Sequence, residues 1–276
     1  MSIDKRVAEH YARRDLASRI LGALQAAGKD VDRLSLEDLA PVDEFHVRGR
    51  PATAELAGAL GLAPGMRVLD VGSGIGGPSR YIAATYDCQV VGIDLTEDYC
   101  RVAALLAERT GLGDRVAYHP GNALAMPFAD ADFDVAYTQH VAMNIDDKAR
   151  LYGEVWRVLK PGGRFGIYDL LQGGGGELVY PVPWARDAST SFVVSPPELR
   201  SLLEAAGFEV ASWRETAAEA RQWIDDTKAR LAQPEPPPTA APLLLGEDFR
   251  TMLLNVFGNL VEDRVRPTEV ICRKPA

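Results

Sequence analysis

The chain has 276 residues, of which 47% are apolar and 25% are charged, and its net charge is −9. A chain of this length can bury one sizeable core. The acidic balance argues against a nucleic acid as partner, because binding to phosphates requires clustered Lys and Arg. Cys88, Cys100 and Cys272 are widely spaced and form no C-x-x-C pair, which indicates reduced thiols and not disulfides or zinc ligands.

The N-terminus has no apolar segment behind its first charged residues, so no signal peptide is predicted. No uninterrupted apolar run approaches the length of a membrane span, about 20 residues. We therefore expect a cytoplasmic protein that has no membrane partner. The sequence leaves the oligomeric state open.

The first 62 residues are predicted to form a helical cap. Three signals divide this cap into segments: Gly28 ends a helix, Ser35 begins a capping box, and Pro51 opens a helix. The predicted helices cover 1–27, a short stretch from Ser35 to Pro41, and Pro51 to Gly61.

The segment 68–77 reads VLDVGSGIGG, which predicts a short buried strand, a glycine-rich turn and the start of a helix. The turn Gly72-Ser73-Gly74 would bring bare backbone close to a ligand. A second apolar strand, 90–93, ends on Asp94, whose carboxylate can accept both hydroxyls of a ribose. The spacing from turn to acid therefore predicts a nucleoside site.

Gly72, Gly74 and Gly77 also satisfy the dinucleotide fingerprint G-x-G-x-x-G, so an NAD-dependent oxidoreductase is an alternative. Asp70, two residues before the first glycine, argues against it. Its carboxylate would repel a pyrophosphate, whereas it suits a ligand that carries a sulfonium and an amine. The motif also follows a helical segment and does not open the chain.

From residue 66 onward, apolar strands alternate with helices, the pattern of a parallel sheet wrapped by helices. Strands are predicted near 66–71, 89–94, 114–119, 132–138, 163–170, 207–214 and 267–273, with helices near 76–86, 96–110, 146–159 and 196–206. We expect an α/β, Rossmann-like fold with a seven-stranded, mostly parallel sheet and helices on both faces. The chain would be a single domain with a cap (1–62), a cofactor-binding core (63–215), a lid inserted before the last strand (216–265) and that strand (266–276).

Further segments fit this order: Asn122-Ala123 after the third strand, FDVAYTQH at 133–140 and LKPGGR at 159–164. Together with the glycine turn they resemble class I S-adenosylmethionine-dependent methyltransferases of the small-molecule branch. That branch includes the sarcosine and dimethylglycine N-methyltransferases and the tocopherol- and ubiquinone-type methyltransferases. The resemblance implies S-adenosyl-L-methionine as cofactor, S-adenosyl-L-homocysteine as product and a small-molecule acceptor.

Roles for several residues follow from this resemblance. Asn122 and Ala123 would flank the adenine, which Leu95 would also touch, and Gln139 would lie near the methionine part. Asp70 would receive the ammonium of the cofactor.

The segment EFHVRG at 44–49 resembles the F-H-x-x-G segment of the betaine-forming N-methyltransferases, which lies over the cofactor. Here Arg48 stands where a second glycine is common. Tyr11 in the first helix would reach the cofactor carboxylate, with core packing as the other interpretation.

Two long insertions are predicted to bind the acceptor, because loops of such length are usually functional. One follows the glycines at 173–176, and the other comprises a helix near 216–232, a proline-rich link at 234–238 and a helix near 246–263. The predicted contacts are Trp184, Arg186, Phe192, Trp223 and Phe249. This aromatic set favours a flat, partly apolar acceptor, and Arg186 would pair with a carboxylate.

Methyl transfer from a sulfonium is an in-line displacement, so the protein mainly aligns the reacting atoms and excludes water. A phenol or enol acceptor gains from a base, for which His140 is the first candidate and His46 the second; a structural histidine is the other interpretation of His140. The histidines form no metal-like pair, so no metal is expected.

We therefore expect methylation of a nitrogen or oxygen atom of a small metabolite, with C-methylation of a quinone- or phenol-like acceptor as the alternative. The alternatives from other functional classes are an NAD-dependent oxidoreductase and a non-catalytic cofactor-binding protein. The identity of the acceptor and the number of methyl transfers remain open.

Overall fold

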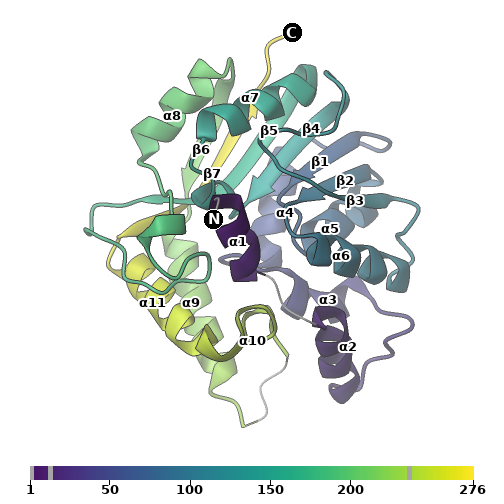
Figure 1. Ribbon diagram of the computed structural model, residues 1–276. Coiled ribbons are helices and arrows are strands. Elements are labelled where there is room, and N and C mark those ends of the chain that lie inside the picture. The colour runs from purple at the N-terminus through teal and green to yellow at the C-terminus, as the bar shows by residue number, and fades with distance from the viewer. Residues whose placement is uncertain (1–2, 12–14, 235–237) are drawn as a thin grey trace.

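The computed structural model describes residues 3–11, 15–234 and 238–276. In these ranges a seven-stranded sheet has the order β3-β2-β1-β4-β5-β7-β6 (Figure 1). All neighbouring strands run parallel except β7, which is antiparallel to both β5 and β6. The strands are β1 (Arg67–Val71), β2 (Gln89–Asp94), β3 (Val116–Pro120), β4 (Phe133–Gln139), β5 (Leu159–Gln172), β6 (Glu209–Glu215) and β7 (Val265–Arg273).

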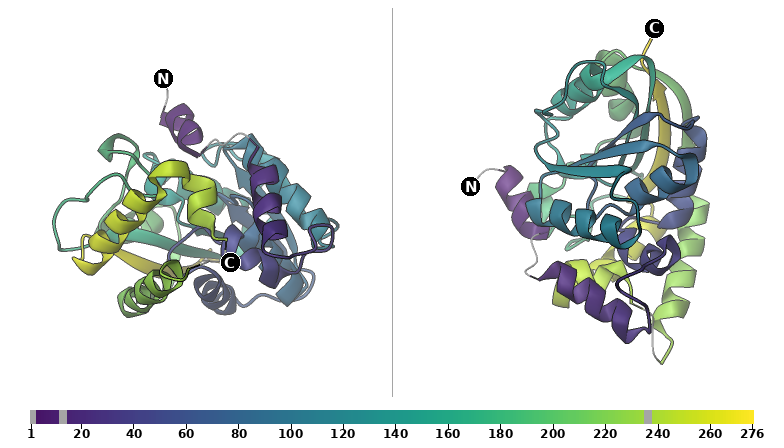
Figure 2. Two further views of the ribbon diagram at one scale, coloured as in Figure 1. Left: turned by 90° about the horizontal axis from the view of Figure 1, so that it is seen from below. Right: turned by 90° about the vertical axis from the view of Figure 1, so that its right-hand side faces the viewer.

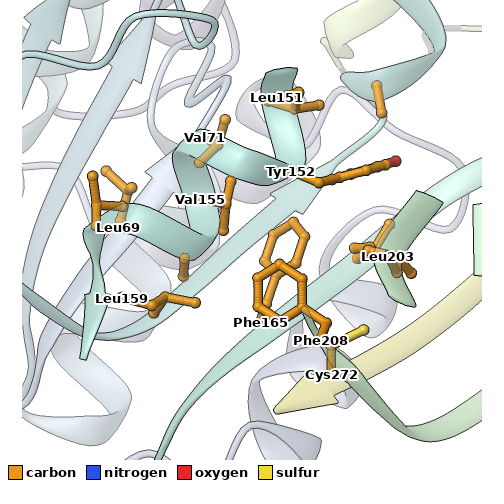
Figure 3. Packing of buried hydrophobic residues seen from close by; sticks show 14 of the residues in the cluster. Leu69, Val71, Leu151, Tyr152, Val155, Leu159, Phe165, Leu203, Phe208 and Cys272 are labelled. Carbon is orange, nitrogen blue, oxygen red and sulfur yellow. The ribbon is translucent and has the colours of Figure 1, made fainter. Parts of the chain in front are cut away.

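Helices cover both faces of the sheet, so the predicted α/β, Rossmann-like fold is confirmed. α4 (Arg50–Ala59), α5 (Gly77–Tyr86) and α6 (Glu97–Arg109) pack on the face to which Val68 of β1 points. α7 (Lys148–Val158) and α8 (Pro196–Ala205) cover the other face, where Leu69 packs. Figure 3 shows part of this second layer, with the rings of Tyr152, Phe165 and Phe208. The alternation along β1 follows from the two-residue period of a strand.

The N-terminal segment departs from the predicted single helix over 1–27. It forms α1 (Ile3–Tyr11) and α2 (Leu16–Ala26), and residues 12–14 between them lie outside the described residues. Asp15 has a left-handed φ of 58°, which an α-helix cannot contain, so α2 begins anew after it.

The third helix, α3 (Leu36–Asp43), begins at the predicted capping box but continues through Pro41. The Ser35 Oγ accepts from the Asp38 backbone N–H at 3.1 Å, and the Ser35 N–H donates to the Asp38 carboxylate at 3.0 Å. Both interactions satisfy donors that the first turn of a helix leaves free.

The insertion before β7 forms α9 (Ala217–Leu231), α10 (Ala240–Leu245) and, after a 3₁₀ turn, α11 (Phe249–Val261). Residues 235–237 of the predicted proline-rich link lie outside the described residues. Figures 1 and 2 show α9–α11 at the same end of the sheet as α2 and α3. Ile20 of α2, Leu39 of α3 and Leu244 of α10 share one buried cluster, which closes this end. Of the helices in the described ranges, none combines the length and apolar character that crossing a bilayer requires.

Candidate functional site

A cavity of ≈570 Å³ opens at the carboxyl ends of the parallel strands. The segments after β1, β2, β3 and β4 contribute Gly72, Leu95, Asn122 and His140 to its wall. The remaining sides come from α1, residues 40–51, residues 183–184 and α9–α11. Ligands of open α/β sheets bind in this position. We call the part of the wall near the glycine turn the polar half and the part near the inserted helices the apolar half, although α9 also contributes Asp226, Thr227 and Arg230 to the wall.

The turn after β1 needs its glycines for two different reasons. Gly72 and Gly74 have φ values of 78° and 52°, which side chains disfavour. A Cβ on Gly72 would lie 2.3 Å from Val141 Cγ2, so only glycine fits there. A Cβ on Gly74 would meet no protein atom within 4 Å and would extend into the cavity. Gly74 therefore leaves room for a ligand at the backbone itself.

Asp94 at the end of β2 is oriented by two backbone donors. Its Oδ2 accepts from the Gly74 N–H and its Oδ1 from the Thr96 N–H, both at 2.8 Å. Burial raises the pKa of Asp94, while these two hydrogen bonds act in the opposite direction. Each carboxylate oxygen has a further lone pair, so Asp94 can still accept from ligand hydroxyls.

Three more buried acids border the polar half: Asp43, Glu44 and Asp70. Asp70 Oδ2 accepts from Ser79 Oγ at 2.6 Å, and burial raises the pKa of Asp70 to about 6, so it is ionised at neutral pH. Burial would also raise the pKa of Glu44, but His46 and Arg50 hold it below its ordinary value. Asp43 and Glu44 are offset by Arg80 and Arg50, whereas Asp70 and Asp94 have no ion-pair partner among the described residues, and these two favour a cationic ligand. Ser73 Oγ is buried here and has no hydrogen-bond partner in the part of the chain that the structure describes.

The predicted adenine contacts lie together at one end of the cavity. Leu95, 37% exposed, lines it beside Asn122 and Ala123. The side chain of Asn122 is held by protein groups, because its Oδ1 accepts from the Leu124 N–H at 2.9 Å and its Nδ2 donates to Asp4 at 2.8 Å. The bond to Asp4 attaches α1 to the turn after β3.

Tyr11 of α1 lines the cavity, but its hydroxyl donates to Asn144 Oδ1 at 3.0 Å. Arg48 also borders the cavity, whereas its guanidinium pairs with Glu55. Gln139 lies on the wall with its amide 3.4 Å from Thr53 Oγ1.

His140 directly follows β4 and has a left-handed conformation, with φ of 54°. Its backbone N–H donates to the Tyr168 carbonyl at 2.8 Å, and its ring stacks on the Tyr168 ring with centroids 5.3 Å apart. Its Nε2 is buried and has no partner among the described protein groups. Burial, and secondarily the charge of His46, lowers the pKa of His140 well below 6.5. His140 is therefore a neutral imidazole at pH 7.

His46 lies beside His140, with ring centroids 5.8 Å apart. Its Nε2 is 3.0 Å from Glu44 Oε2 and its Nδ1 is 3.2 Å from the Val47 carbonyl. Because both ring nitrogens have protein partners, His46 is less available than His140 to exchange a proton with a ligand.

The apolar half is bordered by three of the five predicted acceptor residues, Trp184, Trp223 and Phe249. Trp184 is 2% exposed, and its indole N–H donates to Ser191 Oγ at 2.9 Å. Sequence analysis did not identify the aliphatic residues that complete this wall, which are Met143, Leu244, Leu245, Leu253 and Val256.

The structure does not place Arg186 and Phe192 at this cavity. Arg186 Nη1 pairs with Asp248 at 2.9 Å, and its side chain is 61% exposed. Phe192 donates its backbone N–H to the Met143 carbonyl at 2.7 Å and lines a separate small cavity next to Lys148. Neither side chain lines this cavity, because the direction of a loop side chain depends on contacts that its local sequence does not specify.

Asp43 and Arg50 are two charged residues of the wall that sequence analysis also missed. Both flank the F-H segment at 44–49, so proximity to that segment was the available signal. Within the ranges described above, no group of three or more His, Cys, Asp or Glu side chains is arranged to hold a metal ion.

Comparisons with known proteins agree with this geometry. Residues 69–167 match the family described as "Methyltransferase domain". A sterol 24-C-methyltransferase of Gibberella zeae is 40% identical over 116 residues, which are 42% of this chain and 30% of that protein. The matched segment thus spans under a third of that relative. The predicted resemblance to class I S-adenosylmethionine-dependent methyltransferases is confirmed over this segment.

Two solved structures are similar over more of the chain. Phosphoethanolamine N-methyltransferase 2 of Haemonchus contortus, in complex with S-adenosyl-L-methionine, has a TM-score of 0.72 at 19% identity and covers 85% of this chain and 54% of its own. Geranyl diphosphate C-methyltransferase of Streptomyces coelicolor A3(2), in complex with S-adenosyl-L-homocysteine, has a TM-score of 0.72 at 15% identity. The match covers 99% of this chain and 98% of that structure. These structures share the fold of this chain.

Proposed function

We propose that this chain is an S-adenosylmethionine-dependent methyltransferase that acts on a small molecule with a large apolar part. The observation that carries the proposal is the pairing of Asp94 with the turn at Gly74. An oriented carboxylate at the end of β2 lies beside bare backbone. Such a carboxylate accepts hydrogen bonds from the hydroxyls of a ribose. The family match over residues 69–167 supports the same ligand.

The charges of the polar half favour this cofactor over a dinucleotide. Asp43 and Glu44 are paired with Arg80 and Arg50, whereas Asp70 and Asp94 border the cavity without an ion-pair partner in the described ranges. These two buried carboxylates attract a sulfonium and an ammonium, and they repel a pyrophosphate at short range. An NAD-dependent oxidoreductase is therefore disfavoured.

The apolar half supports an acceptor with a hydrophobic body. Trp223, Phe249 and Leu253 border it from α9 and α11. The sterol relative is named for methylation at carbon. We therefore rank an electron-rich carbon of an apolar acceptor ahead of the nitrogen or oxygen that sequence analysis placed first, and these atoms remain the alternative.

The roles of the residues follow from their contacts. When bound, the cofactor supplies an electrophilic methyl group on a sulfonium. His140 lines the cavity with a neutral imidazole whose buried Nε2 has no partner among the described residues, so we assign to it the proton that a carbon or phenol acceptor loses. The aromatic and aliphatic wall excludes water and orients the acceptor.

The proposal is tested by incubating the protein with S-adenosylmethionine and a panel of sterols, isoprenoids, phenols, quinones and amines. Release of S-adenosylhomocysteine should depend on an apolar acceptor and should be lost with Asp94→Asn. If no acceptor of the panel causes release, although S-adenosylhomocysteine binds, the result would favour the non-catalytic cofactor-binding protein. Methylation of small hydrophilic amines alone would contradict the proposed acceptor class.

A further inference from the structure

One helix of the insertion lines the cavity with a single stripe of side chains. Five residues of α9 border the cavity: Trp223, Asp226, Thr227, Arg230 and Leu231. Their spacing of three or four residues places them on one face of the helix. The stripe changes along α9, from an aromatic ring near the middle of the helix to polar and charged side chains nearer its end.

The beginning of α9 lies close to His140. Thr216 directly precedes the helix, and its Oγ1 is 3.4 Å from the hydroxyl of Tyr168, whose ring stacks on His140. From there α9 extends away from the sheet (Figure 1). At about 1.5 Å per residue, Arg230 lies roughly 20 Å farther along the helix axis. Because His140 and Arg230 border the same cavity, the cavity reaches from the proposed base to the far end of α9.

Arg230 differs from the other two arginines of the cavity wall. Arg48 pairs with Glu55, and Arg50 pairs with Glu44. Arg230 has no carboxylate within 4.0 Å in residues 3–11, 15–234 and 238–276. A guanidinium whose charge no protein carboxylate offsets can bind an anion, and its planar fork matches the oxygens of a carboxylate or a phosphate.

Contacts within α9 hold the Arg230 guanidinium. Its Nη2 donates to Thr227 Oγ1 at 3.2 Å, while the side chain as a whole remains partly exposed and borders the cavity. Asp226, the acid of the same stripe, is exposed and accepts from Gln222 Nε2 at 2.9 Å. It forms no ion pair with Arg230, so the stripe retains a cation toward the cavity.

The rest of this half of the cavity is mostly apolar. Leu244 of α10 borders it together with Leu253 and Val256 of α11. An acceptor in this half meets an apolar wall along its body and the cation of Arg230 at one end. Partial exclusion of water strengthens an ionic contact in such a site.

We propose that the acceptor is an elongated apolar molecule with one anionic group, a carboxylate or a phosphate, at the end remote from the methylated atom, and that Arg230 binds this group. The assignment rests on the proposed methyltransferase function and narrows its acceptor class. The apolar body lies along Trp223 and the aliphatic wall, and the methylated atom lies near His140. Apolar contact supplies most of the affinity, and the ionic contact determines which end of the acceptor faces the cofactor.

Calorimetric titration of the protein saturated with S-adenosylhomocysteine tests the assignment. The probes share a farnesyl chain and differ at its end: farnesyl phosphate, farnesoic acid and farnesol. The wild type should bind the phosphate and the carboxylate about 10- to 100-fold more tightly than the alcohol. Arg230→Gln should remove this preference and leave the affinity for farnesol unchanged. Arg250→Gln is the matched control and should keep the preference, because Arg250 on α11 is exposed and does not line the cavity.

The outcomes separate this assignment from the proposed function. If the wild type does not bind S-adenosylhomocysteine, the proposed function fails and the assignment fails with it. If it does, but the three probes bind equally or not at all, the anionic acceptor is overturned and the proposed function stands. A preference that persists in Arg230→Gln, or that Arg250→Gln removes to the same extent, would overturn the role of Arg230. A preference for only one of the two anions, removed by Arg230→Gln alone, would support the assignment and identify the anion.

Discussion

The backbone N–H of Gly74 donates to Asp94 Oδ2 at 2.8 Å, so the turn after β1 sets the direction of the carboxylate that ends β2. This contact joins the two parts of the sequence that first indicated a nucleoside site. It also makes Gly74 a position where added volume should affect binding before it affects folding.

Gly74→Ala should weaken S-adenosylhomocysteine about tenfold or more, because the new Cβ would occupy the cavity. Gly111→Ala is the control. Gly111 also has a positive φ, 68°, and open space at its Cβ, but it does not line the cavity. Both variants should lose a similar stability, about 1–2 kcal/mol, from the left-handed backbone. Thermal unfolding and calorimetry measure the two effects, and equal binding by both variants would refute the role of Gly74.

His140→Asn should lower kcat about 10²- to 10⁴-fold on a carbon or phenol acceptor while S-adenosylhomocysteine binding changes little. Asn tolerates the left-handed backbone of this position but cannot act as a base. Full kcat in the variant would remove His140 from the mechanism and would indicate an amine acceptor.

The pH profile of kcat gives an independent test of His140. The pKa of His140 is lowered well below 6.5, mainly by burial, so the imidazole loses its base form only when the pH falls through that lowered value. The acid limb that belongs to His140 should therefore lie below pH 6.5 in the wild type and be absent in His140→Asn. An acid limb centred above 6.5, or one that persists in the variant, would contradict this assignment.

Leu253→Ala should raise KM for the acceptor roughly 5- to 30-fold, the equivalent of about 1–2 kcal/mol of lost apolar contact. Leu253 lines the apolar half of the cavity, whereas its neighbour Leu254 on α11 is 64% exposed. Leu254→Ala is thus the matched control and should leave KM unchanged. If both variants or neither change KM, the acceptor does not bind against α11.

Local patterns predicted the parts of the fold that depend on short-range physics. The strands that became β1 and β2 were predicted within a residue, because apolar runs end at glycine or an acid there. The helix predicted over 1–27 was wrong because the conformation of Asp15 divides it, and no sequence signal marks that residue. β5 begins at Leu159 and includes the Pro161-Gly-Gly segment, whereas the strand was predicted near 163–170; Leu159 pairs with Phe133 of β4, and regular pairing with β4 and β7 begins at Arg164.

The residues of the candidate site also fall into those that local sequence patterns predict and those that depend on tertiary packing. Gly74 and Asp94 could be predicted, because both lie at the carboxyl end of a strand, Gly74 just after β1 and Asp94 as the last residue of β2. The closeness of Asp43 to Arg50 could not, since it depends on how α3 and α4 pack against α5 and on the buried partner Arg80.

The most direct test is a titration of wild type, Asp94→Asn and Asp98→Asn with S-adenosylhomocysteine and with NAD⁺. Asp98 is the control, because it lies on α6, is 44% exposed and pairs with Arg101. The wild type and Asp98→Asn should bind S-adenosylhomocysteine in the micromolar range and should not bind NAD⁺, and Asp94→Asn should bind it about 10- to 100-fold more weakly. Unchanged affinity in Asp94→Asn, or binding of NAD⁺ in preference to S-adenosylhomocysteine, would contradict the account.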